Sequence, residues 1–220
     1  MRVVVNAAMS ADGKLSSRRR EQIAISGPKD FDRVDALRAG SDAVMVGVGT
    51  VLADDPHLTL DDPDRQSARR NREESAHPVR VVADSKARTP TDARIVDDAA
   101  TTYLLVSESA PNQRIEALTQ TGARLITAGD ERVELDAALS ALDREGIEQL
   151  MVEGGGELIF SLFEGGLVDE LRVFVGSKVI GGRDAPTLAD GEGFVAEFPE
   201  LELDDVERID DGVLLRYAVV

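Results

Sequence analysis

The chain has 220 residues, of which 42% are hydrophobic and 30% charged, and this is the composition of a globular protein rather than a disordered one. Acidic residues (42) outnumber Lys and Arg (25), and the resulting formal net charge of −17 opposes binding to nucleic acid or to an anionic membrane surface. Cysteine is absent and histidine occurs only twice, which excludes disulfides, thiolate nucleophiles and metal sites built from Cys or from several His.

The N-terminal half alternates apolar and polar segments. We expect buried strands at residues 3–9 and 42–48, with a polar connection at 10–26 that turns at Asp12-Gly13. A helix is predicted over 28–39, with Ser26 as a possible N-cap and an apolar face that includes Phe31, Val34 and Leu37. After a short helical turn through Leu52, the Arg-rich stretch 61–77 is interpreted as a solvated and dispensable loop.

The C-terminal half continues the alternation and then changes character. Four strands are predicted at 79–83, 102–106, 124–127 and 149–152, and three helices at 112–121, 135–144 and 158–164. A strand at 170–175 and a loop at 185–194 precede two strands, 201–209 and 213–220, which flank the hairpin signal Asp210-Asp211-Gly212. This order predicts one α/β domain over residues 1–220, in which a mostly parallel central sheet lies between helices and ends in a C-terminal antiparallel hairpin.

Two glycine-rich segments follow predicted strands, at the sheet edge where α/β proteins bind ligands. They are Gly154-Gly155-Gly156 and Gly47-Val48-Gly49-Thr50. Backbone N–H groups at such a turn can hold a phosphate, although a tight strand-to-helix turn alone would also need glycine. Neither segment has the spacing of a P-loop or of a Rossmann fingerprint, which favours a nucleotide site built from two separate turns.

Several charged residues adjoin these turns. Glu153 could act as a general acid or base, hold a substrate hydroxyl or cap the next helix, and Arg38 could bind an anion or be an exposed cation at a helix end. Asp54-Asp55 could be paired carboxylates for a metal, but Asp55-Pro56 indicates a helix stop and no metal site is expected. His57 is interpreted as a loop histidine.

Taken together, these motifs resemble the riboflavin-pathway reductases, both the stand-alone archaeal and fungal type and the C-terminal half of the bacterial bifunctional deaminase/reductase. The similarity extends from about residue 3 to residue 194. It is carried by Ala8–Lys14, Leu37-Arg38-Ala39, the run Val46–Thr59 that contains TVLADDPHLT, Pro78–Ser85, Val152–Gly156 and Gly166–Leu171. The resemblance implies a dihydrofolate-reductase-like three-layer fold, a homodimer, NADPH as cofactor and reduction of a pyrimidine ribosylamine phosphate to the ribitylamino product.

The resemblance also implies roles for individual residues. Substrate contacts fall on Asn6, Arg38, Leu58 and Glu153, with Arg38 as the partner of the 5′-phosphate and Glu153 facing the ribose. Cofactor contacts fall on Ala8, Thr50, Asp54, Ser85, Gly154, Gly155, Gly156, Glu157 and Leu158.

This sequence departs from the bacterial pattern at two places. Asn6 stands where the bacterial domain usually has Lys, and Leu60-Asp61 stand where an Arg follows the LT of the motif. One of the arginines between Arg65 and Arg72 is a candidate replacement for that Arg. The proton donor is open among Glu153, Asp54 and ordered water.

Several alternatives remain at this stage. A pterin reductase would need a buried acid early in the chain, for which Asp12 is poorly suited, and a non-catalytic nucleotide-binding protein could share the fold. The preference for NADPH over NADH, and for the aminated over the deaminated pyrimidine, is open. No signal peptide or membrane span is recognisable, so we expect a cytoplasmic protein, and the excess of Asp over Lys favours a halophilic one over an ordinary acidic protein.

Overall fold

The computed structural model describes residues 1–21 and 23–220, and the chain divides into two compact units. The first unit contains Met1 and residues 35–151, and the second contains residues 2–34 and 152–220. Two elements contain residues of both units: helix α1 (Pro28–Ala39) begins in the second unit and ends in the first, and strand β6 (Gln149–Gly154) begins in the first and ends in the second.

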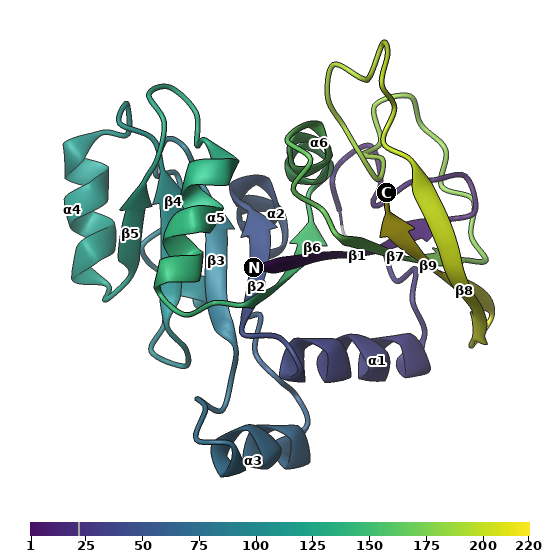
Figure 1. Ribbon diagram of the computed structural model, residues 1–220, viewed down its shortest axis with the longest axis horizontal. Coiled ribbons are helices and arrows are strands. Elements are labelled where there is room, and N and C mark those ends of the chain that lie inside the picture. Colours follow the sequence, from purple (N-terminus) through teal and green to yellow (C-terminus); the bar gives the residue numbers. More distant parts are fainter. Residues whose placement is uncertain (22) are drawn as a thin grey trace. The chain divides into compact units, whose positions relative to one another are not determined.

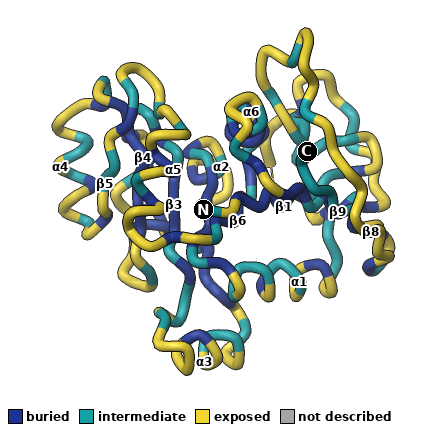
Figure 2. The backbone as a smooth tube through the Cα atoms, viewed as in Figure 1, coloured by how far each residue is buried: buried dark blue, intermediate teal, exposed yellow. Residues whose placement is uncertain are grey.

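Parallel strands form the centre of the first unit. They follow the order β5-β4-β3-β2 and continue into the first half of β6. The residues of β2, β3 and β4 are almost all buried, as the dark tube shows in Figure 2, because runs such as Ala43-Val44-Met45-Val46 are apolar on both faces, whereas β5 at the edge is partly exposed. The strands are β2 (Ala43–Gly47), β3 (Val79–Ala83), β4 (Thr102–Val106) and β5 (Arg124–Thr127).

Short helices surround this sheet. The amphipathic helix α5 buries Ala138, Leu139 and Leu142, and α4 lies beside β5 (Figure 1). The helices of the first unit are α2 (Val48–Asp54), α3 (Pro63–Asn71), the 3₁₀ turn η1 (Arg94–Val96), α4 (Asn112–Gln120) and α5 (Leu135–Arg144).

The second unit combines parallel and antiparallel pairing in the order β6-β1-β7-β9-β8. Strand β1 (Arg2–Ser10) pairs in parallel with β7 (Glu170–Gly176), which pairs antiparallel with β9 (Gly212–Val219), and β9 pairs antiparallel with β8 (Leu201–Ile209). The helix of this unit after β6 is α6 (Gly156–Glu164). The predicted fold class, mixed α/β with a mostly parallel sheet and a C-terminal antiparallel hairpin, is confirmed.

The interpretation of residues 61–77 as a solvated loop is wrong, because most of this segment is helix α3. The side chain of Asp62 caps the helix by accepting from the N–H of Asp64 at 2.8 Å, and Pro63 occupies the first turn, where it needs no hydrogen-bond donor. Arg69 is buried and donates to the carbonyl oxygens of Ser75, Ala39 and Ser41 at 2.8–3.0 Å. The segment is therefore tied through Arg69 to the end of α1 rather than solvated.

Helix α1 has its predicted bounds but not its predicted apolar face. Phe31 is 57% exposed, whereas Asp30 is 1% and Asp35 6% exposed, so the helix turns carboxylates inward. Its N-terminus is capped not by Ser26 but from the β8–β9 hairpin, where Asp210 Oδ2 accepts from the N–H groups of Lys29 (3.0 Å) and Asp30 (3.4 Å). Both carboxylates have partners within the protein, Asp30 in Arg33 and Asp35 in Arg65, as buried charges require.

Candidate active site

The turn between β6 and α6 has the backbone expected of a ligand-binding turn. Gly154 has φ +140° and Gly155 has φ +20°, and a Cβ atom built on Gly154 would meet no atom within 4 Å. Both the conformation and the open space at Gly154 therefore favour close approach of another molecule to the main chain. Helix α6 starts at Gly156, so the backbone N–H groups of its first turn, which have no partner within the helix, point toward this turn.

The remaining residues of this turn have distinct settings. A Cβ on Gly156 would lie 2.6 Å from the carbonyl oxygen of Thr187, so this glycine is required by packing against residues 187–190 within the protein. Glu157 is exposed, Leu158 is 7% exposed and anchors the helix, and Glu153 is half-buried at the end of β6. The structure thus brings the predicted residues Glu153 to Leu158 together on one turn.

On strand β1 of the second unit lie the predicted residues Asn6 and Ala8. Asn6 is 6% exposed, and its Oδ1 accepts a hydrogen bond from Arg33 Nη1 at 2.9 Å. Ala8 is half-buried and packs against a small apolar cluster that includes Ile25 and Phe174. Arg33 was not a candidate in the sequence; its position three residues after Asp30 on a helix was the available signal.

Helix α2 of the first unit carries Thr50 and Asp54. It begins directly after β2, as the glycine-rich sequence Gly47-Val48-Gly49-Thr50 predicts, and Thr50 is half-buried near its start. Asp54 is the last residue of the helix and is exposed, yet partial desolvation raises its pKa above the usual value of an aspartate. A raised pKa makes this carboxyl better suited to carry a proton than an ordinary surface aspartate.

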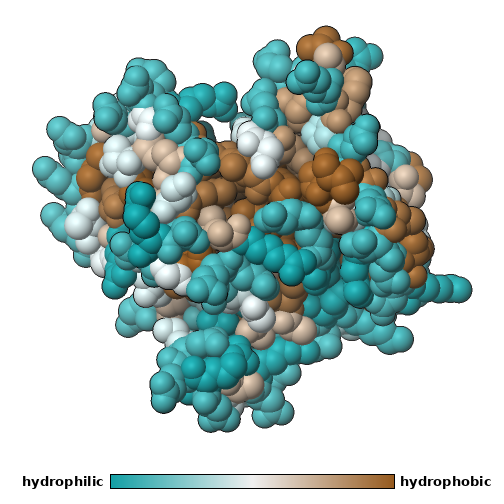
Figure 3. All heavy atoms as spheres, viewed as in Figure 1, coloured by the Kyte–Doolittle hydropathy of each residue, from teal (hydrophilic) through white to brown (hydrophobic). Residues whose placement is uncertain are grey.

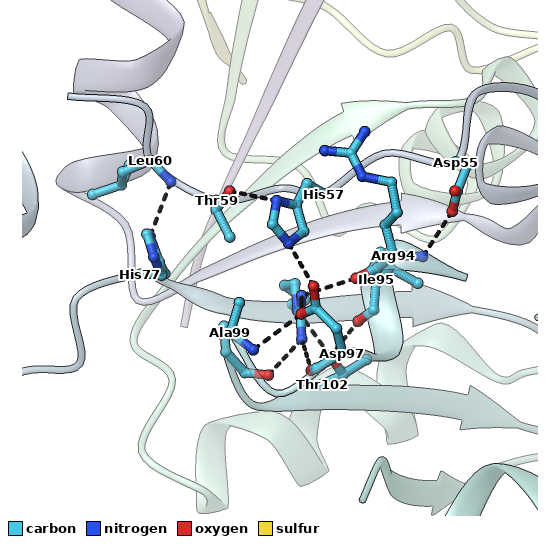
Figure 4. Close-up of polar contacts among 12 residues, drawn as sticks. Asp55, His57, Thr59, Leu60, His77, Arg94, Ile95, Asp97, Ala99 and Thr102 are labelled. Carbon is cyan, nitrogen blue, oxygen red and sulfur yellow. Dashed lines mark hydrogen bonds and ion pairs between the residues drawn. The ribbon is translucent and has the colours of Figure 1, made fainter. Parts of the chain in front are cut away.

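The loop that follows α2 is held in an uncommon conformation. Asp55 has φ +42°, and Leu58, a predicted substrate residue, has φ +52° and is 3% exposed. Asp55 Oδ1 accepts from the N–H of Arg94 at 2.8 Å, and His57 Nε2 lies 2.6 Å from Asp97 Oδ2 (Figure 4). Both contacts attach the loop to η1 and the residue after it.

Arg38 meets this loop from the end of α1. Its Nη1 donates to the carbonyl oxygen of Thr59 at 3.1 Å, and Thr59 Oγ1 lies 3.2 Å from His57 Nδ1. The first unit therefore brings Arg38 and the segment 55–59 together, and the same loop leads back to Thr50 and Asp54 on α2.

Ser85 stands at the end of β3, but its polar groups are partly engaged. Its Oγ accepts from the N–H of Val133 at 3.0 Å, and its carbonyl oxygen accepts from Ser107 Oγ at 2.8 Å. The hydroxyl hydrogen of Ser85 can still be donated to a ligand.

A buried ionic network supports the loop 55–59, and sequence reasoning missed it. Arg80 on β3 is fully buried and donates to Asp97 Oδ1 (2.8 Å) and Thr102 Oγ1 (2.9 Å), as well as to three backbone carbonyl oxygens. A cation in the middle of the apolar strand Val79-Arg80-Val81-Val82 was the signal, because a buried arginine requires acceptors for its whole fork.

Three of the arginines proposed to replace the missing phosphate contact have other partners. Arg65 pairs with Asp35 at 3.0 Å, and Arg69 is buried among carbonyl oxygens. Arg72 forms a two-pronged contact with Glu74 at 2.7 and 3.1 Å. These contacts assign Arg65, Arg69 and Arg72 structural partners within the first unit.

Asp12 does not have the properties of a pterin-protonating acid. Its carboxylate accepts from Ser10 Oγ (2.6 Å) and from the N–H groups of Ile180 (3.0 Å) and Gly181 (2.7 Å), and these hydrogen bonds lower its pKa to about 2. The group is exposed and ionised, and it fixes the turn at residues 10–14.

Two further properties concern the described ranges, 1–21 and 23–220. In them, no helix combines the length and the apolar character needed to cross a bilayer. Nor do three or more His, Asp or Glu side chains in these ranges gather as they would around a metal ion.

Comparison with known proteins identifies the family. The model of the RibD C-terminal domain matches residues 1–215, and the chain belongs to this family. It is 47% identical over 96% of its length to a protein of Archaeoglobus fulgidus and 44% identical over 99% to one of Methanothermobacter thermautotrophicus, covering 94% and 97% of those proteins. Both are named 2,5-diamino-6-ribosylamino-4(3H)-pyrimidinone 5′-phosphate reductase.

Bacterial RibD proteins are longer. The chain is 34% identical to RibD of Actinobacillus pleuropneumoniae over 99% of its own length, but it covers only 57% of that protein. Among solved structures, a pyrimidine reductase-like protein of Corynebacterium diphtheriae superposes with a TM-score of 0.88 at 17% identity, covering 100% of this chain and 92% of that one. The low identity makes this a likeness of fold.

Proposed function

We propose that the chain is an NADPH-dependent oxidoreductase that reduces the ribosyl side chain of 2,5-diamino-6-ribosylamino-4(3H)-pyrimidinone 5′-phosphate to the ribitylamino product. The observation that carries the proposal is the turn at Gly154, where a Cβ would meet no atom within 4 Å and the carboxylate of Glu153 is the preceding side chain. The names of the two archaeal relatives, matched over nearly their whole length, support the substrate. Both compact units belong to this single reductase domain in the proposal.

The reaction divides the work between cofactor and protein. NADPH supplies a hydride to C1′ of the ring-opened ribosylamine, and a proton completes the reduction of its C=N bond. The protein must hold the reacting atoms within reach and control the proton. In the proposal, Glu153 at the end of β6 holds a ribose hydroxyl or moves that proton, and Asp54, whose pKa is raised, is the second candidate for the proton.

The other assignments follow from the chemistry of each group. In the second unit, the N–H groups of Gly154–Gly156 and the first turn of α6 suit the pyrophosphate of the cofactor. In the first unit, the Thr50 hydroxyl suits a cofactor phosphate, and the Ser85 hydroxyl suits the adenosine-side phosphate or ribose. Arg38 offers a forked cation to the substrate 5′-phosphate next to the loop of Leu58. Each of these contacts is part of the proposal.

One assay tests the function. Purified protein, NADPH and the pyrimidine ribosylamine phosphate are mixed, and loss of the nicotinamide absorbance is followed while mass spectrometry detects a product that has gained two hydrogen atoms. We expect turnover with this substrate and none with dihydrofolate. Turnover with dihydrofolate alone would contradict the proposal, and parallel runs with NADH and with the deaminated pyrimidine give both preferences.

The cofactor assignment has a matched pair of glycine variants. Gly154→Ala strains the backbone at the proposed cofactor turn, whereas Gly122→Ala imposes a comparable strain (φ +92°, no atom within 4 Å) at the end of α4. We expect Gly154→Ala to weaken NADPH binding in calorimetric titration by about tenfold or more and Gly122→Ala to leave it unchanged. Equal NADPH affinity in the two variants would contradict the assignment of NADPH to the Gly154 turn.

A homodimer is the second part of the proposal, and strand β8 supports it. It is the edge strand of its sheet, and its apolar residues Leu201, Leu203 and Val206 are 40–54% exposed. Apolar side chains also reach the surface near β9 and β8 in Figure 3. An unpaired edge strand with an apolar surface is an aggregation hazard unless it is covered, and a second copy of the chain would cover it.

The high acidity leads us to propose that the protein works in a salt-rich cytoplasm. With a net charge of −17, the protein repels both NADPH and a sugar phosphate at low ionic strength. Salt at 1 M shortens the range of this repulsion to about 3 Å. We expect activity and unfolding temperature to rise with KCl up to molar concentrations, and a maximum at low salt would contradict a halophilic protein.

A further inference from the structure

The second unit contains a buried chain of polar groups in which the predicted substrate residue Asn6 is joined to two residues, Arg33 and Asp30, that have no assigned role. Arg33 of α1 donates through Nη1 to Asn6 Oδ1 at 2.9 Å, and its Nε and Nη2 each lie 2.8 Å from Asp30 Oδ1. Asp30 is 1% and Asn6 6% exposed, while the Arg33 side chain is 16% exposed. These three side chains join helix α1 to strand β1 at Asn6, which is a predicted substrate residue.

This contact decides which way the Asn6 amide points. A guanidinium carries only donors, so the amide atom that faces Arg33 must be the oxygen. The Nδ2 group of Asn6 then points elsewhere, and it makes no hydrogen bond to any residue that the structure describes. Because Asn6 Nδ2 is not among the buried polar atoms that lack a partner, its two N–H donors reach solvent and are available to an acceptor on a ligand.

Asp30 fixes Arg33 in turn. Its Oδ1 holds two nitrogens of the guanidinium, and the N–H of Asp30 is itself tied to Asp210 at 3.4 Å. The Arg33 charge is neutralised locally, so its third arm serves as an oriented hydrogen-bond donor to Asn6.

We propose that Arg33 is a positioning residue that locks the Asn6 amide with its oxygen toward α1, so that Nδ2 donates to an acceptor oxygen of the substrate. This rests on the proposed function, because the substrate is the pyrimidine ribosylamine phosphate. Asn6 contacts the substrate, and Arg33 acts through Asn6.

The variant Asn6→Asp distinguishes the acceptor role of the Asn6 amide from its donor role. A carboxylate still accepts from Arg33 but offers an acceptor where Asn6 has its donor, so the fold is kept and the donor is lost. We expect Asn6→Asp to raise the substrate KM about tenfold or more, with the KM for NADPH changed less than about twofold. Arg33→Met is expected to raise the substrate KM by a similar factor, and Arg33→Lys, which can still donate to Oδ1, to restore part of it.

A double-mutant cycle tests whether Arg33 works through Asn6. If it does, Arg33→Met adds almost nothing to the effect of Asn6→Ala. Lys29→Met removes an exposed cation of the same helix and serves as the control with wild-type constants. If the wild type is active but Arg33→Met leaves the substrate KM unchanged, or if the two effects are fully additive, the role of Arg33 is wrong while the proposed function stands. A wild type without turnover would contradict the proposed function and this inference with it.

Discussion

His57 Nε2 lies 2.6 Å from Asp97 Oδ2, and the other oxygen of Asp97 accepts from the buried guanidinium of Arg80 at 2.8 Å. Asp97 therefore connects the loop after α2 to strand β3 through one carboxylate (Figure 4). Because an ionised carboxylate only accepts, His57 donates through Nε2, and in the neutral imidazole Nδ1 then accepts from the Thr59 hydroxyl at 3.2 Å. This tautomer fixes the histidine ring between Asp97 and its own loop.

Asp97→Asn should destabilise the protein because it leaves Arg80 buried without its charged partner. Loss of one partner of a fully buried pair costs about 3–5 kcal/mol, and we expect about 2 kcal/mol here since the Asp97 side chain is 39% exposed. Urea unfolding at neutral pH measures the change. His57→Gln, which removes only the exposed end of the network, is expected to cost about 0.5–1 kcal/mol, and a larger loss in His57→Gln than in Asp97→Asn would contradict this order.

Acid unfolding gives a second test of the same carboxylate. Partial burial raises the pKa of Asp97, but hydrogen bonds from Arg80, the N–H of Ala99 and His57 outweigh it and lower the pKa to about 2. The folded pKa lies below the unfolded one, so Asp97 stabilises the fold above about pH 4, and this contribution is lost as pH falls toward 2. Given the exposure of the group, we expect it to amount to about 1 kcal/mol. The stability of Asp97→Asn should fall less than that of wild type between pH 4 and pH 2, and parallel curves would contradict the assignment.

Most elements were predictable because they follow from simple patterns in the sequence. The parallel strands are apolar runs, and the hairpin at Asp210-Asp211-Gly212 has the turn residues that its geometry requires. Helix α3 was missed because its charged composition obscured the capping signal Asp62-Pro63, which the structure shows to be effective. Composition described how polar the segment is, and the cap determined its conformation.

The site was predictable where chemistry depends on the main chain and less so where it depends on side-chain partners. The turn at Gly154 was recognised because its backbone requirement is visible as glycine. The inward face of α1 was not, since apolar spacing pointed to Phe31, whereas the buried residue is the adjacent Asp30. A buried carboxylate such as Asp30 needs a charged partner, which is Arg33. The contact from Arg33 to Asn6 joins two elements that are distant in the sequence, so no local sequence pattern predicts it.

Glu153→Gln tests the carboxylate beside the glycine turn. The amide has the same shape but cannot take up or release a proton, so we expect kcat to fall by about 100-fold or more while NADPH binds with unchanged affinity. Stopped-flow turnover and titration of NADPH fluorescence separate the two properties. Glu164→Gln, at the exposed far end of α6, is the control for a lost negative charge on the same helix. Wild-type turnover in Glu153→Gln would exclude a role for its charge.

Arg38→Ala tests the proposed phosphate contact. Loss of a charged two-pronged hydrogen bond should raise the substrate KM about 10- to 100-fold and the KM for NADPH much less. Arg38 also donates to the carbonyl oxygen of Thr59, so Arg38→Lys, which keeps a cation, should recover part of the affinity. Arg72→Ala removes an exposed arginine of the same unit that pairs with Glu74 and should leave both constants unchanged. An equal rise of both KM values in Arg38→Ala would argue against a specific contact with the substrate.

Strand β8 provides the test of the dimer. Val206 is 54% exposed on an edge strand, and a carboxylate in its place would be buried without a partner if a second copy covered this surface. We therefore expect Val206→Asp to shift the protein to a monomer in light scattering coupled to gel filtration, at the salt concentration where wild type is dimeric. Val195→Asp alters a residue that is 98% exposed outside the strand and should remain dimeric. A wild type that is monomeric at micromolar concentrations would contradict the dimer itself. A dimeric Val206→Asp would show that the dimer does not form through β8, because an apolar edge covered by a second copy cannot accept an unpaired charge without a loss of affinity.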